Sequence, residues 1–383
     1  MRPLRATVPV LAALVIVVAS ACGSKSGLVT DDRAPVPLVD ASRPPDGGFD
    51  TFPCSWSYGQ PLDLGAAMPG TTLGGAVHGL ADVAWTQTGL ATPTDSGLSR
   101  LVSLTDPPRV IGTVPVAGAV PVHGMVDGWT VLASDCSLSF FDDDGAPLRL
   151  FIAPVNTPPC VFDSLDTNFI DVSAAGAPGR SSSATRMTTR GRVVHDVAST
   201  SPLGRDLRDL RTVVSADGSL VARFAFDESA VVAGSLSRAS GELLWEGLVG
   251  RTDGRFAVSL DRLRDAAVVL LVHLDGATLV RLPFDPGGLV VQPLADIPGV
   301  IGGADNAVVT NETEALIPLA DGRVAVQPLS GTELRFLPAP REGEVIDLRI
   351  LLAPGESRGG LLYRYLDPAG ADRLAFRTLT CNR

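Results

Sequence analysis

The sequence predicts an all-β fold, and two observations support this. From about residue 53 the chain is a succession of short apolar, β-branched runs, such as "RLVSLT" and "GRVAVQPL", separated by Gly, Pro, Asp and Asn. Runs of this length bounded by turn residues are typical of strands. Asp-Gly, a strong hairpin signal, begins at Asp127, Asp144, Asp217, Asp253, Asp275 and Asp321. We therefore expect an antiparallel meander, with a helical turn only in "SPLGRDLRDLRTV".

A near-duplication gives the period of this meander. "AVHGLADVAWT" and "PVHGMVDGWTV" share His-Gly, Asp and Trp-Thr, with 45 residues from His78 to His123 and 44 from Trp85 to Trp129. Four short strands with their turns need about 45 residues, which is one blade of a β-propeller. About 330 residues then predict seven four-stranded blades, and six or eight are also compatible. We expect the two segments to occupy the same position in successive blades, with each Trp packed between sheets.

Two stretches resemble known propeller blades. "SLSRASGELLWEGLVG" resembles a blade of the PQQ-type repeat at Gly241 and Trp245, although Arg238 and Ser240 depart from its usual Asp and Thr. "LVSLTDPPRVIGTVPVAG" resembles WD40-like repeat families in which one strand ends in Asp-Pro and the next in Ile-Gly. Each stretch covers fewer than 20 residues, so the resemblance implies the architecture and no activity.

The N-terminus predicts export and a lipid anchor. Arg2 and Arg5 precede a short apolar run, as in a secretory signal peptide covering residues 1–21. Ala19-Ser20-Ala21-Cys22 resembles the lipobox of bacterial lipoproteins, which implies lipidation of Cys22, and Gly23 favours the outer membrane. An ordinary signal peptide with an incidental Cys is the alternative. Residues 22–52, rich in Gly, Ser, Pro and Asp, predict a flexible tether, and residues 53–383 a single propeller domain.

The cysteine count predicts disulfides. If Cys22 carries lipid, four cysteines remain in an exported and therefore oxidising setting. Three pairings are possible, and we favour Cys136–Cys160, a short loop closure, with Cys54–Cys381, which ties the first ordered residues to the last. No CxxC or Cys/His spacing favours the rival four-Cys metal site, so we expect no metal and no cofactor.

The charge restricts the partners. Removing Arg2 and Arg5 from 31 basic residues leaves 29 against 42 acidic ones, a net charge of −13. Such an acidic chain does not favour nucleic acid or an anionic lipid surface as partner. The remaining expectation is a monomer held at the membrane by its N-terminal lipid, with an envelope protein as partner.

No catalytic site is recognisable, and whether the chain is an enzyme stays open. The leading hypothesis is a non-enzymatic, lipid-anchored propeller of the bacterial envelope that acts as a binding or scaffold module. One alternative is a propeller hydrolase or lyase acting on glycans or lactones. Another is binding of a small ligand or metal at the axial channel by His78 and His123, for which packing between blades is the competing interpretation.

Overall fold

The computed structural model describes most of the chain from residue 54 to residue 382. The gaps are residues 68–70, 79–81, 91–97, 115, 117–119, 153–159, 163–167, 176–180, 190, 201–207, 216, 227–229, 262–264, 285–290, 303–307, 312, 331–332 and 353–356. The expected signal peptide, Cys22 and tether lie outside the described residues. The described residues belong to one compact unit, Gly48–Arg383. They contain no helix, and hence no helix long and apolar enough to cross a membrane.

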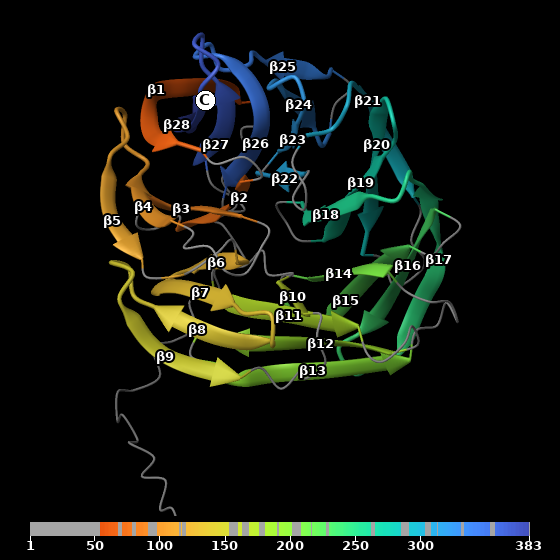
Figure 1. Ribbon diagram of the computed structural model, residues 1–383. Coiled ribbons are helices and arrows are strands. Elements are labelled where there is room, and N and C mark those ends of the chain that lie inside the picture. The colour runs from red at the N-terminus through yellow and green to blue at the C-terminus, as the bar shows by residue number, and fades with distance from the viewer. Residues whose placement is uncertain are drawn as a thin grey trace, which may run out of the picture. The chain divides into compact units, whose positions relative to one another are not determined.

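The described strands form seven four-stranded antiparallel sheets, so the all-β, seven-bladed prediction is confirmed (Figure 1). Blade 1 contains β2 (Thr71–His78), β3 (Val83–Leu90), β4 (Leu98–Ser103) and β5 (Val110–Val114). Blade 2 contains β6 (Val122–Met125), β7 (Gly128–Leu132), β8 (Ser137–Phe141) and β9 (Pro147–Ile152). Blade 3 contains β10 (Cys160–Phe162), β11 (Phe169–Ala175), β12 (Ser181–Thr188) and β13 (Val193–Thr200).

Blade 4 contains β14 (Arg208–Val214), β15 (Leu220–Phe226), β16 (Val231–Arg238) and β17 (Leu243–Arg251). Blade 5 contains β18 (Phe256–Leu260), β19 (Ala266–Val272), β20 (Gly276–Pro283) and β21 (Gln292–Pro298). Blade 6 contains β22 (Val309–Thr310), β23 (Glu314–Pro318), β24 (Val324–Pro328) and β25 (Arg335–Leu337). In these six blades the strands follow chain order from the centre of the ring to its periphery (Figure 1).

Blade 7 is built from both ends of the propeller. Its inner three strands are β26 (Glu344–Leu352), β27 (Arg358–Leu366) and β28 (Asp372–Asn382), and its outermost strand is β1 (Ser55–Ala66). β1 pairs with β28 along its whole length, from Ser55 opposite Asn382 to Ala66 opposite Arg373. This pairing closes the ring, because blade 7 combines three strands from the C-terminal side with one strand from the N-terminal side.

Each blade has two ends, and the antiparallel order decides which turns lie at each. Outermost strands all begin at the same end of the ring, and we call it the closure end because Cys54 precedes β1 there. Turns between the first and second strands also lie at the closure end. Turns between the second and third strands, and the connections between blades, lie at the opposite end, which we call the distal end.

Apolar side chains between adjacent blades form the core. Clusters of at least seven buried apolar residues fill six of the seven interfaces between blades. These are the interfaces of blades 1 and 2, 2 and 3, 4 and 5, 5 and 6, 6 and 7, and 7 and 1. Alternation along each strand places successive side chains in the two neighbouring interfaces. This explains why runs such as "AAVVLLV" of β19 are buried at every position.

The interface of blades 3 and 4 differs. Its described apolar cluster contains only Val214 and Val221, both from blade 4. Facing them, Arg186 of β12 donates to both carboxylate oxygens of Asp171 of β11, at 2.7 and 2.9 Å, and contacts the carbonyl of Ser215 in blade 4. Both side chains are buried, and the guanidinium stacks on the Phe169 ring. A bidentate ion pair therefore lies where the other interfaces are apolar.

The two tryptophans of the duplicated segments are not equivalent, contrary to expectation. Both are fully buried between sheets, but Trp85 points from blade 1 towards blade 2 and Trp129 points back, with ring centroids 5.5 Å apart in an edge-to-face contact. Trp85 lies opposite Ala76 in the strand pairing, and Trp129 lies opposite Gly124. The six residues between His78 and Trp85 become five in the second segment, and this single-residue difference reverses the face that Trp occupies.

The turn predictions are mostly confirmed. Five of the six Asp-Gly pairs join consecutive strands within a blade, whereas Asp253-Gly254 joins blade 4 to blade 5. The expected helical turn is wrong over its described part, because Arg208–Val214 is β14, with Leu210, Thr212, Val213 and Val214 buried.

Candidate binding surface

The four described cysteines form two disulfides, and these are the pairs favoured by the cysteine count. Cys54 bonds Cys381 across 327 residues, joining β1 to β28 at the closure end. Cys136, in the turn between β7 and β8, bonds Cys160 at the start of β10. The second bond links blade 2 to blade 3 at the distal end, so each end of the ring carries one disulfide.

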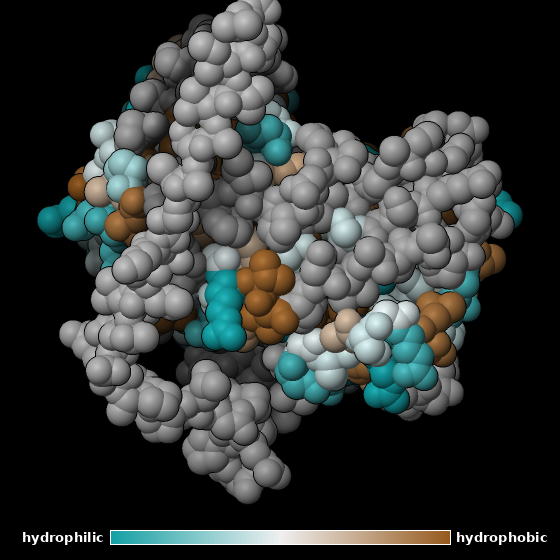
Figure 2. Space-filling model, turned by 90° about the horizontal axis from the view of Figure 1, so that it is seen from below, coloured by the Kyte–Doolittle hydropathy of each residue, from teal (hydrophilic) through white to brown (hydrophobic). Residues whose placement is uncertain are grey.

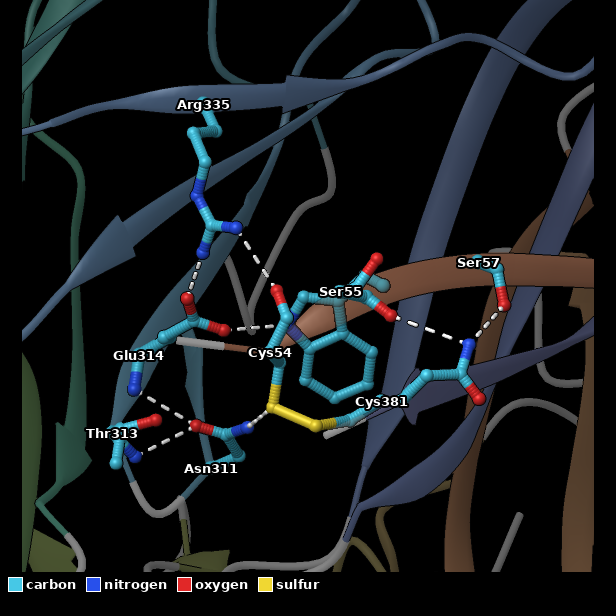
Figure 3. Close-up of a disulfide and its surroundings, with 10 residues drawn as sticks. Cys54, Ser55, Ser57, Asn311, Thr313, Glu314, Arg335 and Cys381 are labelled. Carbon is cyan, nitrogen blue, oxygen red and sulfur yellow. Dashed lines mark hydrogen bonds and ion pairs between the residues drawn. A yellow bond between two sulfur atoms is a disulfide. The ribbon is translucent and has the colours of Figure 1, made fainter. Parts of the chain in front are cut away.

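A polar network surrounds the closing disulfide and joins it to blade 6 (Figure 3). The indole Nε1 of Trp56 in β1 donates to the Glu314 carboxylate at 2.7 Å. Arg335 of β25 pairs with the same carboxylate and donates to the Cys54 carbonyl at 3.0 Å. Asn311 donates to the Cys54 sulfur at 3.3 Å and accepts from the backbone N–H of Glu314 at 2.8 Å. Blade 6 thus holds the N-terminal strand in place.

Burial and hydrogen bonding have opposite effects on the pKa of the Glu314 carboxyl. Its side chain is fully buried, and this burial raises the pKa of the carboxyl, while the Trp56 indole and Arg335 lower it. No sequence pattern predicts this network, because Trp56 and Glu314 are 258 residues apart. Its role is structural, since every polar group in it faces a neighbouring strand.

The two candidate ligand-binding histidines lie in successive interfaces. His78, at the end of β2, is buried with its ring 5.4 Å from Trp129, and its Nε2 lies 3.0 Å from Asp143 of blade 2. His123 of β6 is buried with its ring 6.1 Å from Phe162 of blade 3. Gly124 allows β2 and β6 to approach closely, because a Cβ there would lie 2.2 Å from the Val77 carbonyl oxygen.

Each histidine contacts the blade that follows it, and the two side chains face different interfaces, so the structure does not bring them together in one interface. The described residues contain no group of three or more His, Cys, Asp or Glu side chains placed to hold a metal ion.

The most exposed large hydrophobic side chain among the described residues lies at the distal end. Leu274, in the turn between β19 and β20, is 83% exposed. Val300, in the connection from blade 5 to blade 6, is 56% exposed. Pro298 and Ala320 are also exposed. We call Leu274, Pro298, Val300 and Ala320 the distal patch.

Hydrogen bonds between four connecting segments hold the distal patch. The N–H of Leu274 donates to the Asp253 carboxylate at 2.5 Å, and the N–H of Gly299 donates to the Asp275 carbonyl at 3.0 Å. The N–H of Ala320 donates to the Val300 carbonyl at 2.8 Å. The turns of blades 5 and 6 are therefore fixed to one another. An exposed apolar side chain on a fixed backbone loses little conformational entropy when a partner covers it.

Charged side chains of both signs surround the distal patch, with one more acidic than basic. The exposed or half-buried charged residues of the same turns and strand ends are Arg251, Asp253, Arg255, Asp275, Asp296, Asp321 and Arg323. Arg323 is already paired with Asp321 at 2.7 Å. The patch therefore combines apolar side chains with a net negative border.

The comparisons with known proteins agree with this architecture. No family model matches the chain, and no curated protein matches it. Among solved structures, the WD40 domain of Toxoplasma gondii coronin is similar over 85% of this chain and 88% of its own, with 9% identity and a TM-score of 0.53. BBS1N, solved in complex with ARL6DN, is similar over 86% of this chain and 98% of its own, with 14% identity and a TM-score of 0.51.

A weaker similarity is to BamB from Moraxella catarrhalis, over 85% of this chain and 99% of that one, with 15% identity and a TM-score of 0.43. Identities this low show the fold alone. The protein is a seven-bladed β-propeller whose ring is closed by a strand from its N-terminal side.

Proposed function

We propose that this protein is a lipid-anchored component of the bacterial cell envelope whose propeller binds another envelope protein. The distal patch is the observation that carries the proposal. Leu274 and Val300 are exposed on turns fixed by hydrogen bonds, and exposed apolar groups rimmed by polar ones mark interaction sites.

The partner surface that fits the distal patch is apolar and basic. Leu274, Pro298 and Val300 supply apolar area, and Asp253 and Asp275 favour lysine or arginine on the other side. Charge complementarity of this kind increases association rate and specificity more than affinity. The propeller acts here as a monomer.

The anchor is Cys22, and the proposed domain order follows from it. Residues 1–21 are removed as the signal peptide, residues 22–52 form the tether, and residues 53–383 form the propeller domain. The two disulfides support an exported location, because such bonds persist in oxidising compartments. We place the protein at the outer membrane on the strength of Gly23.

Replacing Cys22 with serine is expected to move the protein from the membrane fraction to the soluble fraction of the envelope. The serine hydroxyl does not take the thioether-linked lipid, and the described residues provide no membrane-spanning helix. Cell fractionation with immunoblotting, after a carbonate wash that releases proteins held only by reversible contacts, and a mass measurement of the N-terminus check this. A C22S chain that stays in the washed membrane fraction would contradict the anchor and leave the propeller unaffected.

Substituting Leu274 and Val300 together with serine is expected to lower partner recovery at least about tenfold, because the variant removes the apolar centre of the surface. Recovery is measured by cross-linking and affinity purification from solubilised envelopes. The matched control is Leu248→Ser, since Leu248 is 61% exposed on β17, outside the patch. A partner retained by L274S/V300S, or lost equally in L248S, would exclude the distal patch as its binding site.

A further inference from the structure

Exposed aliphatic residues recur at the start of the outermost strand in four consecutive blades. These are Val110 and Ile111 of β5, Leu148 of β9, Val193 and Val194 of β13, and Leu243 of β17, each between 41% and 60% exposed. They occupy the first or second position of their strands. We call these six residues the apolar arc.

The apolar arc lies at the closure end of blades 1 to 4. Strand pairing places its members there, because Val110 is opposite Val102, Val193 is opposite Met187 and Leu243 is opposite Ser237, all near the ends of their partner strands. In blades 5 and 7 the first residue of the outermost strand is polar and exposed, Gln292 in β21 and Ser55 in β1. In blade 6 the second residue of β25 is Phe336, which is 38% exposed and lies against the Arg323 guanidinium. Exposed aliphatic residues at this position are thus confined to blades 1 to 4 among the described residues.

The apolar arc is shaped for an extended surface. Its members lie on four separate outer strands that follow one another around the ring (Figure 1). On the side of the molecule where β9 and β13 lie, hydrophobic and hydrophilic residues alternate in small patches (Figure 2). A partner that contacts all of these residues must therefore extend over four blades.

We propose that the apolar arc rests on the surface of the bilayer to which Cys22 is anchored. The chain that leads to Cys22 leaves the propeller at Cys54, which is also at the closure end and is on blade 7, next to blade 1. The 31 intervening residues span about 30 Å on average if they are flexible, and about 100 Å at full extension. The chain towards Cys22 therefore leaves the propeller at the end that carries the apolar arc.

The side chains beside the apolar arc suit the lipid-water interface. Arg109 directly precedes Val110, and Arg192 directly precedes Val193, and both are exposed. Arginine places its alkyl stem along apolar surface and its guanidinium among lipid headgroups. The exposed acidic residues at the same end of blades 1 to 4 outnumber the basic ones and are Asp82, Asp106, Asp127, Asp143, Asp144, Asp217 and Glu242, against Arg109, Arg192 and Arg238. Burial of aliphatic side chains, not attraction to anionic lipid, is therefore the main contribution to binding.

Vesicle binding by the C22S chain tests the proposal without the covalent lipid. We expect this chain to co-sediment with phosphatidylcholine vesicles, and to do so no more than a fewfold better when phosphatidylglycerol is added. The combined V110S, I111S, V193S and V194S substitution is expected to lower the partition coefficient at least about tenfold. The matched control is L274S/V300S, which removes exposed aliphatic residues from the distal end and is expected to bind as the parent does.

The outcomes separate this proposal from the proposed function on which it rests. The arc proposal is overturned if the C22S chain does not bind vesicles. It is also overturned if the variant with the four arc substitutions (the arc variant) binds vesicles as well as the L274S/V300S control does. Loss of a protein partner in the arc variant without vesicle binding shows a protein surface instead and also overturns it. None of these results changes the fractionation of the lipidated chain. Urea unfolding of every variant confirms that the exposed substitutions leave the fold intact.

Discussion

Replacing Cys54 and Cys381 together with serine is expected to lower the free energy of unfolding by about 4–5 kcal/mol. The disulfide closes a loop of 327 residues, and constraining so long a loop removes much of the entropy of the unfolded chain. Urea unfolding under non-reducing conditions, followed by tryptophan fluorescence, measures the change. Trp56 lies in the closing network and is one of the four tryptophans of the chain, so release of β1 contributes to the fluorescence change.

The second disulfide supplies the matched control. Cys136 and Cys160 are only 24 residues apart, so their replacement is expected to cost about 3 kcal/mol on the same entropy argument. A C136S/C160S variant as unstable as C54S/C381S, or more so, would show that loop closure does not govern the stability of the ring. Addition of reductant to the parent should reproduce the sum of the two effects.

Replacing Asp171 with asparagine is expected to destabilise the propeller by about 3–5 kcal/mol, because Arg186 would remain buried without a counter-charge. No described apolar cluster comparable to those of the other interfaces supports this junction of blades 3 and 4. The change is measured by urea unfolding. An exposed ion pair, Arg238 with Glu242, provides the control, and E242Q is expected to change stability by less than about 0.5 kcal/mol.

The double variant D171L/R186M separates the ion pair from the interface that contains it. Removing both charges together leaves no unpaired buried group, so we expect it to recover most of the stability that D171N loses. If the double variant is as unstable as D171N, the geometry of the ion pair stabilises the junction in addition to the compensation of charge. If D171N itself is as stable as the parent, the junction does not depend on the pair.

The architecture could be predicted because its signals are local. Apolar runs bounded by turn residues determine where strands begin and end, and the length of the meander determines how many blades fit. The repeat predicted the period of the blades correctly, but its two tryptophans do not occupy equivalent positions. One residue fewer between His and Trp moves Trp129 to the opposite face of its strand from Trp85, and a sequence pattern does not show that reversal.

The surface features could not be predicted, because they depend on where strands end and on distant partners. The run "AAVVLLVHL" is apolar as far as Leu274, so the sequence predicts a strand throughout. In the structure β19 stops at Val272, because the His273 N–H bonds the Gly276 carbonyl in a tight turn, and Leu274 becomes exposed. Glu314 and Trp56 likewise meet only through ring closure.

Ring closure by β1 has a consequence for biogenesis. Among the described strands, the one that completes blade 7 is the first to be synthesised, and its partner β28 is the last. Until β28 has been synthesised, β1 has no neighbour in its sheet and the ring stays open. Contacts of such high sequence separation form slowly, so ring closure is a late step of folding, and the bond between Cys54 and Cys381 marks its end.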